Sequence, residues 1–516
     1  MSKKKSFAQR VVDKAYYAVN GKPKTFRRFP HAKKRNMFEG AQQTSITHSW
    51  TTTPQPINEV LKKNLKTLRA RSREQQFNND YARRFIGMCK SNVVGDKGIV
   101  LQAKSKSKNG ELDVMANQAI EAAYKDWSKP ENCDVKGRCS REEMERLFIS
   151  TVAGDGECIV RMIYGKSVSK YGFALQFIDP ELLDADLNED IRGSSNKIKM
   201  GIEVNQYDKP IAYYFKQTAG DYYYNGKHYT RVPAKDIIHG FITEYVDQMR
   251  GIPWMSTALL RLNMLGGFEN AALVNARVGA SKMGFFTSES GDDYKGDGTE
   301  NENGTGNTIS ESEPGTFEQL QAGTTFTAFD PAYPNGEYTY FLKGMLRGIA
   351  SGLGANYNTL ANDLEGVNYS SLREGAINER EIWKLLQNWM ITSFSSIIYN
   401  KWLERVILSP GIPIGKTRLQ PEMIDKYRDV YFQGKRWQWV DPLKEMNGNQ
   451  AAIDARIKSR SQIIRANGDD PDEVWREIER ENKMLEGMGI KPDSMTADEP
   501  EESKDAKDDN EKDDKE

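Results

Sequence analysis

Few side chains in this sequence could catalyse a reaction, and none has neighbours at the spacing that catalysis requires. The four histidines, His31, His48, His228 and His239, lie in unrelated contexts, and no two have the spacing of a metal-binding pair. His239 follows two isoleucines and is interpreted as a histidine at the end of a β-strand. The sequence contains neither a GxSxG nucleophile motif nor a Walker motif.

Carboxylates and cysteines do not form a recognisable site either. The acids Asp179, Glu181 and Asp184 are interpreted as solvated turn residues with a capping role. Acids that are close in sequence do not indicate acid–base catalysis unless they also line a pocket. Cys133 and Cys139 lack a neighbouring histidine, and the four scattered cysteines are typical of a reducing compartment. The glycine-rich segment 291–315 misses the EF-hand and P-loop patterns and predicts a flexible loop. The sequence therefore predicts no enzyme, no metal and no cofactor, with a cryptic nuclease or hydrolase as a rival hypothesis.

The two ends of the chain carry opposite charge. The 516 residues have no net charge, since Lys+Arg and Asp+Glu each total 73, but residues 1–40 are basic and residues 498–516 mainly acidic. Such tails predict arms that contact different partners, or two ends that are merely soluble. Tyr16, Tyr17 and Phe26 lie in the basic arm, so it could become ordered on an anionic surface. No apolar run is long enough to span a membrane, and no apolar segment follows the basic start as in a secretory signal.

Hydrophobic periodicity and turn signals predict an α+β protein. The 3.6-residue period of helices appears in residues 57–88, 110–127, 141–152, 257–283, 338–353, 371–406, 449–466 and 471–487. Short β-branched or alternating runs predict strands at residues 98–102, 158–162, 174–178, 200–204, 211–215 and 236–239. The buried stripe of the helix over 371–406 is predicted to contain Ile382, Leu385, Leu386, Trp389, Ile397 and Trp402.

The helix predicted over residues 257–283 is apolar on nearly every face. Such a helix must be buried on several sides, either as the core helix of one domain or as a wall helix between copies in a ring. Its small residues would permit close approach of neighbouring copies. The contact between copies is predicted at Leu262, Leu265, Ala272 and Ala276.

A series of short motifs occurs in a definite order along the chain. The residues 68–102 contain RSR, NN-YARR and SNVVG, and later come GDGE at 154–157, FIDPELL at 177–183, RGIPWMSTALLRL at 250–262, NYSSLREG at 368–375 and WVDPLKE at 439–445. In sequence and in order this series resembles the lambda-type portal proteins of tailed bacteriophages. Each motif alone is weak, but their shared order covers roughly four hundred residues.

The resemblance implies a portal fold with named parts. The expected bounds are a basic N-terminal arm at 1–45, an α+β wing at 46–250, a first stem helix at 251–284, a clip at 285–336, a second stem helix at 337–353, a tunnel loop at 354–372, a long helix and return to the wing at 373–440, a helical crown at 441–490 and a disordered acidic tail at 491–516. The resemblance also implies a ring, most often of twelve copies, at one vertex of the capsid in the virion, assembled in the host cytoplasm.

The same resemblance implies partners and a DNA channel. The expected partners are double-stranded DNA bound without regard to sequence, the terminase large subunit, head–tail connector or adaptor proteins, and the major capsid and scaffold proteins. Lys343 and Arg347 of the second stem helix are expected to face the channel, although an ordinary solvated face or an intersubunit salt bridge explains them equally well. The expected tunnel-loop contacts are Asn356, Asn358, Asn362, Asp363, Glu365, Asn368 and Tyr369. The alternative function is a non-enzymatic nucleic-acid-binding or scaffold protein of another assembly.

Overall fold

The computed structural model describes residues 7–20, 45, 48–217, 228–280, 284–288, 324–328, 337–437, 442–467 and 469–488. Residues 1–56 and residues 57–516 form two compact units, and helix α1 (Phe7–Asn20) belongs to the first. This helix is not among the elements that the sequence predicts, because its apolar residues lie within a basic arm. The predicted loop at 291–315 and the predicted tail at 491–516 lie outside the described residues.

Helices of very different length make up much of the second unit. Those before residue 281 are α2 (Ile57–Asn78), α3 (Asp80–Cys89), α4 (Val114–Trp127), α5 (Pro130–Cys133), α6 (Arg141–Asp155) and α7 (Leu259–Ala280). Those after residue 336 are α8 (Glu337–Leu353), α9 (Tyr357–Ala361), α10 (Tyr369–Met390), α11 (Ser396–Val406), α12 (Ile424–Tyr427), α13 (Pro442–Asp454), α14 (Arg460–Asn467) and α15 (Pro471–Gly487). Short 3₁₀ turns lie at Pro180–Leu182, Ala234–Asp236 and Pro421–Met423.

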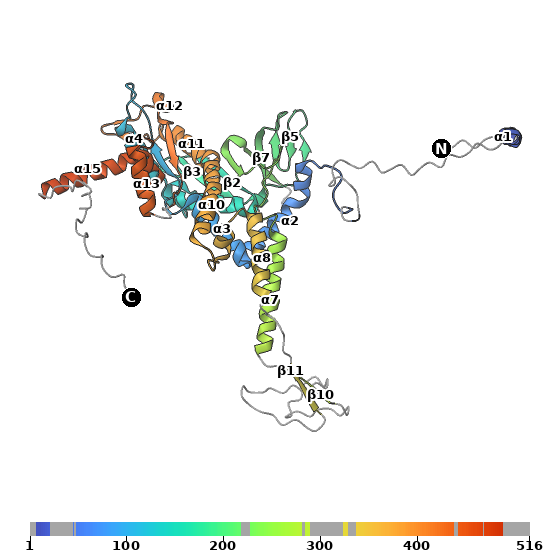
Figure 1. Ribbon diagram of the computed structural model, residues 1–516. Helices are drawn as coiled ribbons and strands as arrows, with labels where there is room; N and C mark the ends of the chain where they lie inside the picture. The colour runs from blue at the N-terminus through green and yellow to red at the C-terminus, as the bar shows by residue number, and fades with distance from the viewer. Residues whose placement is uncertain are drawn as a thin grey trace, which may run out of the picture. The chain divides into compact units, whose positions relative to one another are not determined.

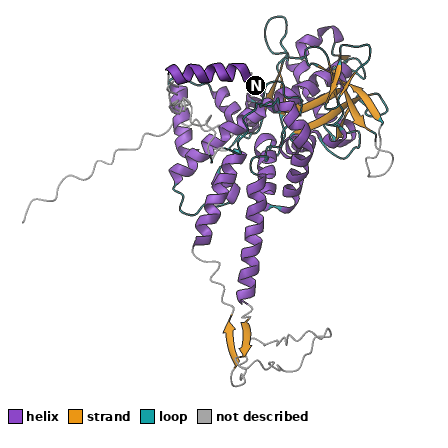
Figure 2. Ribbon diagram, turned by 90° about the vertical axis from the view of Figure 1, so that its right-hand side faces the viewer, coloured by secondary structure: helices purple, strands orange, loops and turns teal. Residues whose placement is uncertain are grey.

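Two antiparallel sheets occupy the region where the sequence predicts strands. In the three-stranded sheet, β2 (Glu157–Tyr164) lies between β3 (Phe173–Ile178) and β9 (Ile237–Phe241). The five-stranded sheet follows chain order through β4 (Glu189–Asp190), β5 (Lys197–Lys199), β6 (Ile202–Val204), β7 (Pro210–Lys216) and β8 (Tyr229–Pro233). The two sheets lie together (Figure 2), and Ile159 of β2 joins Met200 and Tyr213 in one apolar cluster. The predicted α+β class is confirmed.

Three further strand pairs lie in the described part of the chain. β1 (Val100–Ala103) pairs with β14 (Val430–Gln433), although more than three hundred residues separate them. β10 (Gly284–Ser288) pairs with β11 (Thr324–Ala328), and β12 (Pro413–Ile414) pairs with β13 (Thr417–Arg418). The long helices α7 and α8 lie side by side, as Figure 1 shows. In the chain, α7 comes before β10, and α8 comes after β11.

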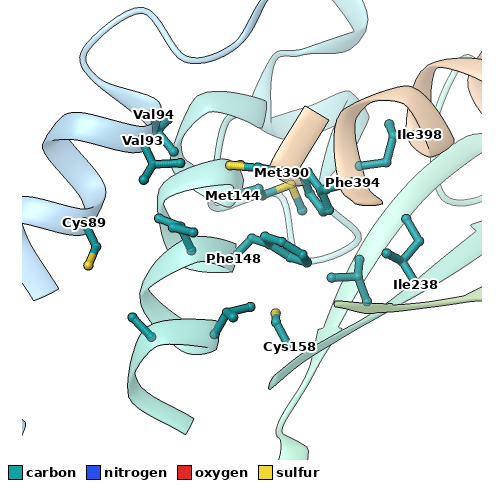
Figure 3. Packing of buried hydrophobic residues seen from close by; sticks show 14 of the residues in the cluster. Cys89, Val93, Val94, Met144, Phe148, Cys158, Ile238, Met390, Phe394 and Ile398 are labelled. Carbon is teal, nitrogen blue, oxygen red and sulfur yellow. The ribbon is translucent and has the colours of Figure 1, made fainter. Parts of the chain in front are cut away.

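The main core forms around helix α6. Phe148 is fully buried and stacks on Phe394 with ring centroids 4.3 Å apart, and Figure 3 shows Met144 and Met390 beside this pair. A Cβ on Gly240 of β9 would lie 2.2 Å from the Phe148 ring, so the glycine allows the sheet to approach the helix. Replacing a buried phenylalanine by alanine destabilises a core by ~3–5 kcal/mol.

The structure divides the first predicted helix. The prediction of one helix over residues 57–88 is wrong, because Asn79 accepts hydrogen bonds from the backbone N–H groups of Tyr81 and Ala82, both at 3.1 Å, and starts α3. A π-helical turn, Lys90–Val94, then ends at Gly95, which has a φ of 79°. The helix predicted over residues 449–466 is likewise two helices, α13 and α14, separated by a turn at Arg456, whose φ is 57°.

The long helix is present but turned relative to its predicted stripe. A π-helical turn, Ile391–Ser395, joins α10 to α11. Leu385 is 71% exposed, whereas Trp383, Met390 and Phe394 are buried. Ile382 and Ile397 of the predicted stripe are also exposed, while Trp402 is buried as predicted. Several faces of this helix carry apolar residues, so the periodicity of the sequence predicted the wrong buried face.

Candidate functional site

The carboxylate of Glu157 is the centre of a buried ionic network at the start of β2. It is fully buried and accepts two hydrogen bonds from Arg250 Nε, both at 2.9 Å. Arg69 Nη2 donates at 2.8 Å, His239 Nε2 lies 3.0 Å away, and the backbone N–H of Gly251 donates at 3.1 Å. Four donor groups from three distant segments therefore converge on one carboxylate.

One face of α2 supplies the basic side of this network. Arg69, Ser72 and Arg73 lie on the same face because they are three and four residues apart. Arg69 Nη1 donates to Glu181 at 2.8 Å, and Ser72 Oγ donates to the carbonyl of Gly154 at 2.5 Å. Arg73 donates to both oxygens of Asp155, at 2.8 and 2.6 Å. The helix is thereby attached to the α6–β2 junction along two of its turns.

The network keeps Glu157 ionised. Burial alone would raise the pKa of this carboxyl, but Arg250, His239 and Arg69 hold the pKa well below its ordinary value. The acid is therefore a charged anchor that joins α2, β2, β9 and the segment before α7. A general base needs a pKa near the working pH, so this environment does not suit acid–base catalysis.

Two glycines let the backbones cross beside Glu157. Gly156 has a φ of 88°, and a Cβ there would lie 2.4 Å from the carbonyl carbon of Ile252. A Cβ on Gly251 would lie 2.0 Å from the carbonyl oxygen of Gly156. Only glycine fits either position, which gives a physical reason for the glycines in the GDGE and RGIPW motifs.

The acids at 179–184 are not simply solvated. Asp179 does cap the following turn by accepting from Glu181 N at 3.0 Å, but it also pairs with Arg73 at 2.7 Å. Glu181 pairs with Arg69, and Asp184 accepts from the Tyr229 hydroxyl at 2.7 Å. Asp179 is an exposed cap, as predicted, with 40% of its side chain exposed, and Asp184 also caps its turn by accepting from Asp186 N at 3.1 Å. The prediction of solvated side chains is wrong for Glu181 and Asp184, which are only partly exposed.

A second polar site joins α8 to the segment that follows it. Lys343 Nζ lies 3.1 Å from Asp363 Oδ2 and 3.8 Å from Glu365 Oε2. The hydroxyl of Tyr357 donates to the same Asp363 oxygen at 2.7 Å. The Arg347 guanidinium lies over the Tyr357 ring, 5.3 Å from its centroid. Both predicted channel cations thus contact groups of the same subunit. We call Lys343, Arg347, Tyr357 and Asp363 the α8–α9 latch.

Two pKa shifts follow from this latch. Hydrogen bonds from Tyr357 and Lys343 hold the pKa of Asp363 below its ordinary value. Burial and the hydrogen bond to Asp363 raise the pKa of Tyr357 to about 12. At neutral pH, Asp363 is therefore an anion that can pair with Lys343, and Tyr357 is a neutral hydrogen-bond donor to it.

The predicted tunnel loop at 354–372 is shorter and more ordered than expected. It contains α9, and residues 369–372 form the first turn of α10. Asn356 caps α9 through Asn358 N at 3.0 Å, Asn362 ends α9 with a φ of 54°, and Asn368 caps α10. Three predicted DNA contacts thus have local structural roles. Tyr369 is the first residue of α10, and Glu365 is fully open to solvent, with 87% of its side chain exposed.

The remainder of α9 is tied to α10 and α3. Leu360 is buried and belongs to the main core. Glu379 of α10 accepts from Thr359 Oγ1 at 3.1 Å and from Asn356 N at 3.5 Å, and burial raises the pKa of this acid. Arg84 of α3 donates to the Thr359 carbonyl at 3.4 Å. Apart from Gly354 and the first turn of α10, the exposed residues of the segment therefore lie between residues 362 and 368.

The predicted contact residues of α7 mostly face inward. Leu262, Leu265 and Ala272 are buried within the subunit, so the interface prediction is wrong for them, whereas Ala276 is partly exposed. Four large apolar side chains of α7 are exposed instead: Leu260, Met264, Leu273 and Val274, which are 73%, 63%, 69% and 60% exposed. Periodicity could not assign these faces, because nearly every face of this helix is apolar.

Two other kinds of site are absent from the described residues. No group of three or more His, Cys, Asp or Glu side chains there is placed to hold a metal ion. In the same part of the chain, no helix is both long enough and apolar enough to cross a membrane.

Comparison with known proteins decides the family. Residues 43–387 match the family described as phage portal protein, lambda family. The chain belongs to this family. It is 34% identical over 459 residues to the probable portal protein of Halomonas phage phiHAP-1, covering 88% of this chain and 87% of that protein. It is 22% identical over 481 residues to portal protein B of Escherichia phage lambda, covering 87% and 89%.

Solved structures with a similar chain come from gene transfer agent (GTA) particles. The neck of an empty GTA particle matches with a TM-score of 0.43 and 14% identity, covering 83% of this chain and 100% of that chain. The neck of a native GTA particle, computed with C12 symmetry, matches with a TM-score of 0.42 and 13% identity, covering 77% and 92%. Both scores are low.

The family motifs that the sequence displays meet at the Glu157 network. Arg69, Glu157 and Arg250 come from three separate motifs, and sequence reasoning did not single them out as partners. A signal was present, since Glu157 directly precedes an apolar strand and Arg250 precedes an apolar segment. A charge at such a position must find a partner when the segment is buried.

Proposed function

We propose that the chain forms a portal ring at one capsid vertex, through which double-stranded DNA enters and leaves. The family match over residues 43–387 carries this proposal. The ring would be a structural part of the virion with no catalytic role, assembled in the host cytoplasm from about twelve copies. Packaging energy would come from a separate terminase ATPase docked on the ring.

The exposed side of α7 supports assembly into a ring. Leu260, Met264 and Val274 recur at helical spacing on one side of the helix, and each is more than half exposed. A contiguous apolar surface of this kind marks a contact with another protein. In the proposed ring it packs against the next copy, so α7 and α8 are the two stem helices, and β10 and β11 lie at the base of the clip.

The α8–α9 latch is the proposed DNA-facing element. Asn358, Asn362, Glu365, Asn368 and Tyr369 belong to this segment or border it. The latch contains two cations, and Asp363 with Glu365 balances their charge. Such a balanced surface suits a channel through which phosphates slide, because an unpaired row of cations would hold the duplex.

The other parts of the chain take the remaining family roles in this proposal. Residues 46–250 and 373–440 form the wing, and α13 to α15 form the crown. Terminase, the head–tail connector proteins, and the capsid and scaffold proteins are the proposed docking partners. The basic arm at 1–45 carries the positive charge that an anionic partner would require.

Imaging and charge variants test the proposal separately. Negative-stain images of the purified chain should show rings with a central hole, and a protein that stays monomeric would contradict the proposal.

Lys343→Gln and Asp363→Asn both break the latch but leave opposite charge in the channel. We expect Asp363→Asn to slow DNA release from filled heads and Lys343→Gln to speed it, because only the first leaves a free cation for phosphate.

A matched control removes a lysine elsewhere. Lys384→Gln removes an exposed lysine that pairs with Glu381 on α10, outside the latch. It should leave DNA release unchanged. Equal release rates for Lys343→Gln, Asp363→Asn and the unmodified chain would show that the latch does not face DNA.

A further inference from the structure

A pocket opens where β1 and the start of α4 meet the first turns of α15. Its volume is about 380 Å³, and part of its wall is apolar. Leu112, Val114 and Trp475 line it and are 37%, 47% and 40% exposed. These half-exposed apolar side chains are not covered within the subunit, so the pocket is open to an apolar group from outside.

Acidic side chains dominate the charge of this pocket. Glu121, Asp470, Asp472 and Glu473 line it, against only two cations, Lys104 and Arg476. Lys104 is already engaged, since its Nζ lies 3.2 Å from Asp472 and 3.6 Å from Asp470. Glu473 forms no ion pair within the described part of the chain. The pocket therefore suits an apolar side chain with cations beside it.

The turn between α13 and α14 carries such a group. Ile457 is 76% exposed, so it does not fill the pocket of its own subunit. Arg456 and Lys458 flank it, are exposed, and form no ion pair with any residue that the structure describes. No acid follows Asp454 before residue 469, so the turn is strongly basic. An exposed isoleucine between two cations complements a half-apolar pocket with an acidic rim.

The turn is held in a defined shape. The backbone N–H groups of Ile457 and Lys458 both donate to the carbonyl of Ala452, at 2.9 and 3.1 Å. Ser459 and Gln462 then cap the start of α14 reciprocally, at 2.9 and 3.1 Å. Ile457 is therefore presented without a large entropic cost of ordering when it binds.

We infer that Ile457 of one subunit inserts into the pocket of the next subunit. In this contact, Arg456 and Lys458 of one copy face Glu473 and Glu121 of the other. In the proposed ring, Ile457 of each copy enters the pocket of the next, so the contact is heterologous and repeats around the ring. A reciprocal two-fold pair would give covalent dimers only, and not a ladder, in the test below. The inference rests on the proposed ring and assigns one contact within it, between crown and wing of adjacent copies.

A disulfide across the contact is the direct test. Ile457→Cys with Val114→Cys in one chain should give, under oxidising conditions and without reductant on the gel, a ladder of covalent oligomers from assembled rings. Each single variant is the matched control and should give about tenfold less of the ladder. The chain's own cysteines do not confound this test, because Cys89, Cys133 and Cys158 are buried and the controls share partly exposed Cys139.

Charge reversal is the second test. Lys458→Glu should weaken the contact and lower the ladder yield about tenfold, and adding Glu473→Lys should restore it. Lys483→Glu, at the other end of α15, should leave the yield unchanged. A Lys458→Glu variant that is not rescued by Glu473→Lys would overturn the assigned charge pairing.

The outcomes separate this contact from the ring itself. Rings in negative stain without a ladder would overturn the contact and leave the proposed function standing. A double variant that cross-links only within one subunit would also overturn the contact. A chain that forms no ring would overturn the proposed function together with this inference.

Discussion

Replacing Glu157 by glutamine tests whether the buried network holds the wing together. The change keeps the shape of the side chain but removes its charge, so Arg250 and Arg69 lose the carboxylate on which both converge. The Arg250 side chain is 0% exposed and that of Arg69 is 3% exposed, so water cannot replace the lost partner. Breaking a buried ion pair in this way costs about 3–5 kcal/mol.

The loss expected for Glu157→Gln is a large fraction of the free energy of unfolding of an ordinary protein. Folded proteins are stable by only ~5–15 kcal/mol, so Glu157→Gln should unfold at much lower urea concentration. The measurement is a urea unfolding curve at pH 7, followed by tryptophan fluorescence. Glu479→Gln is the matched control, because its carboxylate pairs with Lys483 on the surface of α15, and it should leave the midpoint unchanged.

The lowered pKa of Glu157 also predicts how the stability difference between Glu157→Gln and the unmodified chain depends on pH. The pKa of Glu157 is lowered on folding, so the stability it contributes is present above its unfolded pKa and is lost as the pH falls through its folded pKa. The difference between the variant and the unmodified chain should be constant from pH 8 to about 5 and should shrink below about pH 4. A loss under about 1 kcal/mol at pH 7 would refute the reasoning that this carboxylate anchors four segments.

Three further outcomes are expected. Met264→Asp should abolish rings in native mass spectrometry while circular dichroism stays unchanged, and intact rings with this variant would contradict the revised interface. Buried Leu262→Ala should instead lower stability by ~2–5 kcal/mol. Gly156→Ala should yield little folded protein, because its Cβ would meet the backbone of Ile252 at 2.4 Å, and normal solubility would show that this crossing adapts. Asn79→Ala should destabilise the start of α3 by ~1 kcal/mol in urea unfolding, and no change would mean that Asn79 is not the cap.

Some features could be read from the sequence because they depend on residues close together in the chain. Asp470 and Pro471 predicted the start of α15, and the alternating segments between residues 157 and 241 predicted antiparallel strands. The ordered motifs predicted the family, and the family match confirmed it. Caps, turns and periodicity are local, so their physical causes are visible in a few adjacent residues.

Other features required the tertiary structure. The residues near Glu157 in the sequence do not identify Arg69 or Arg250 as partners of its carboxylate, since 88 and 93 residues separate these arginines from Glu157. The solvent side of α7 and the buried side of α10 were also undetermined, because several of their faces are apolar and only the neighbouring elements select one. The asparagines after α8 looked like loop residues, yet three of them cap or end helices.

The sequence by itself thus determined the class of fold, the order of its elements and the family of the protein. The tertiary structure decided which charges pair, which faces are covered and which cations are free. Burial and ion pairing depend on which distant segments pack together, and one sequence pattern is compatible with many such packings. For that reason Lys343 looked like a free channel lysine in the sequence but is paired with Asp363 in the folded chain.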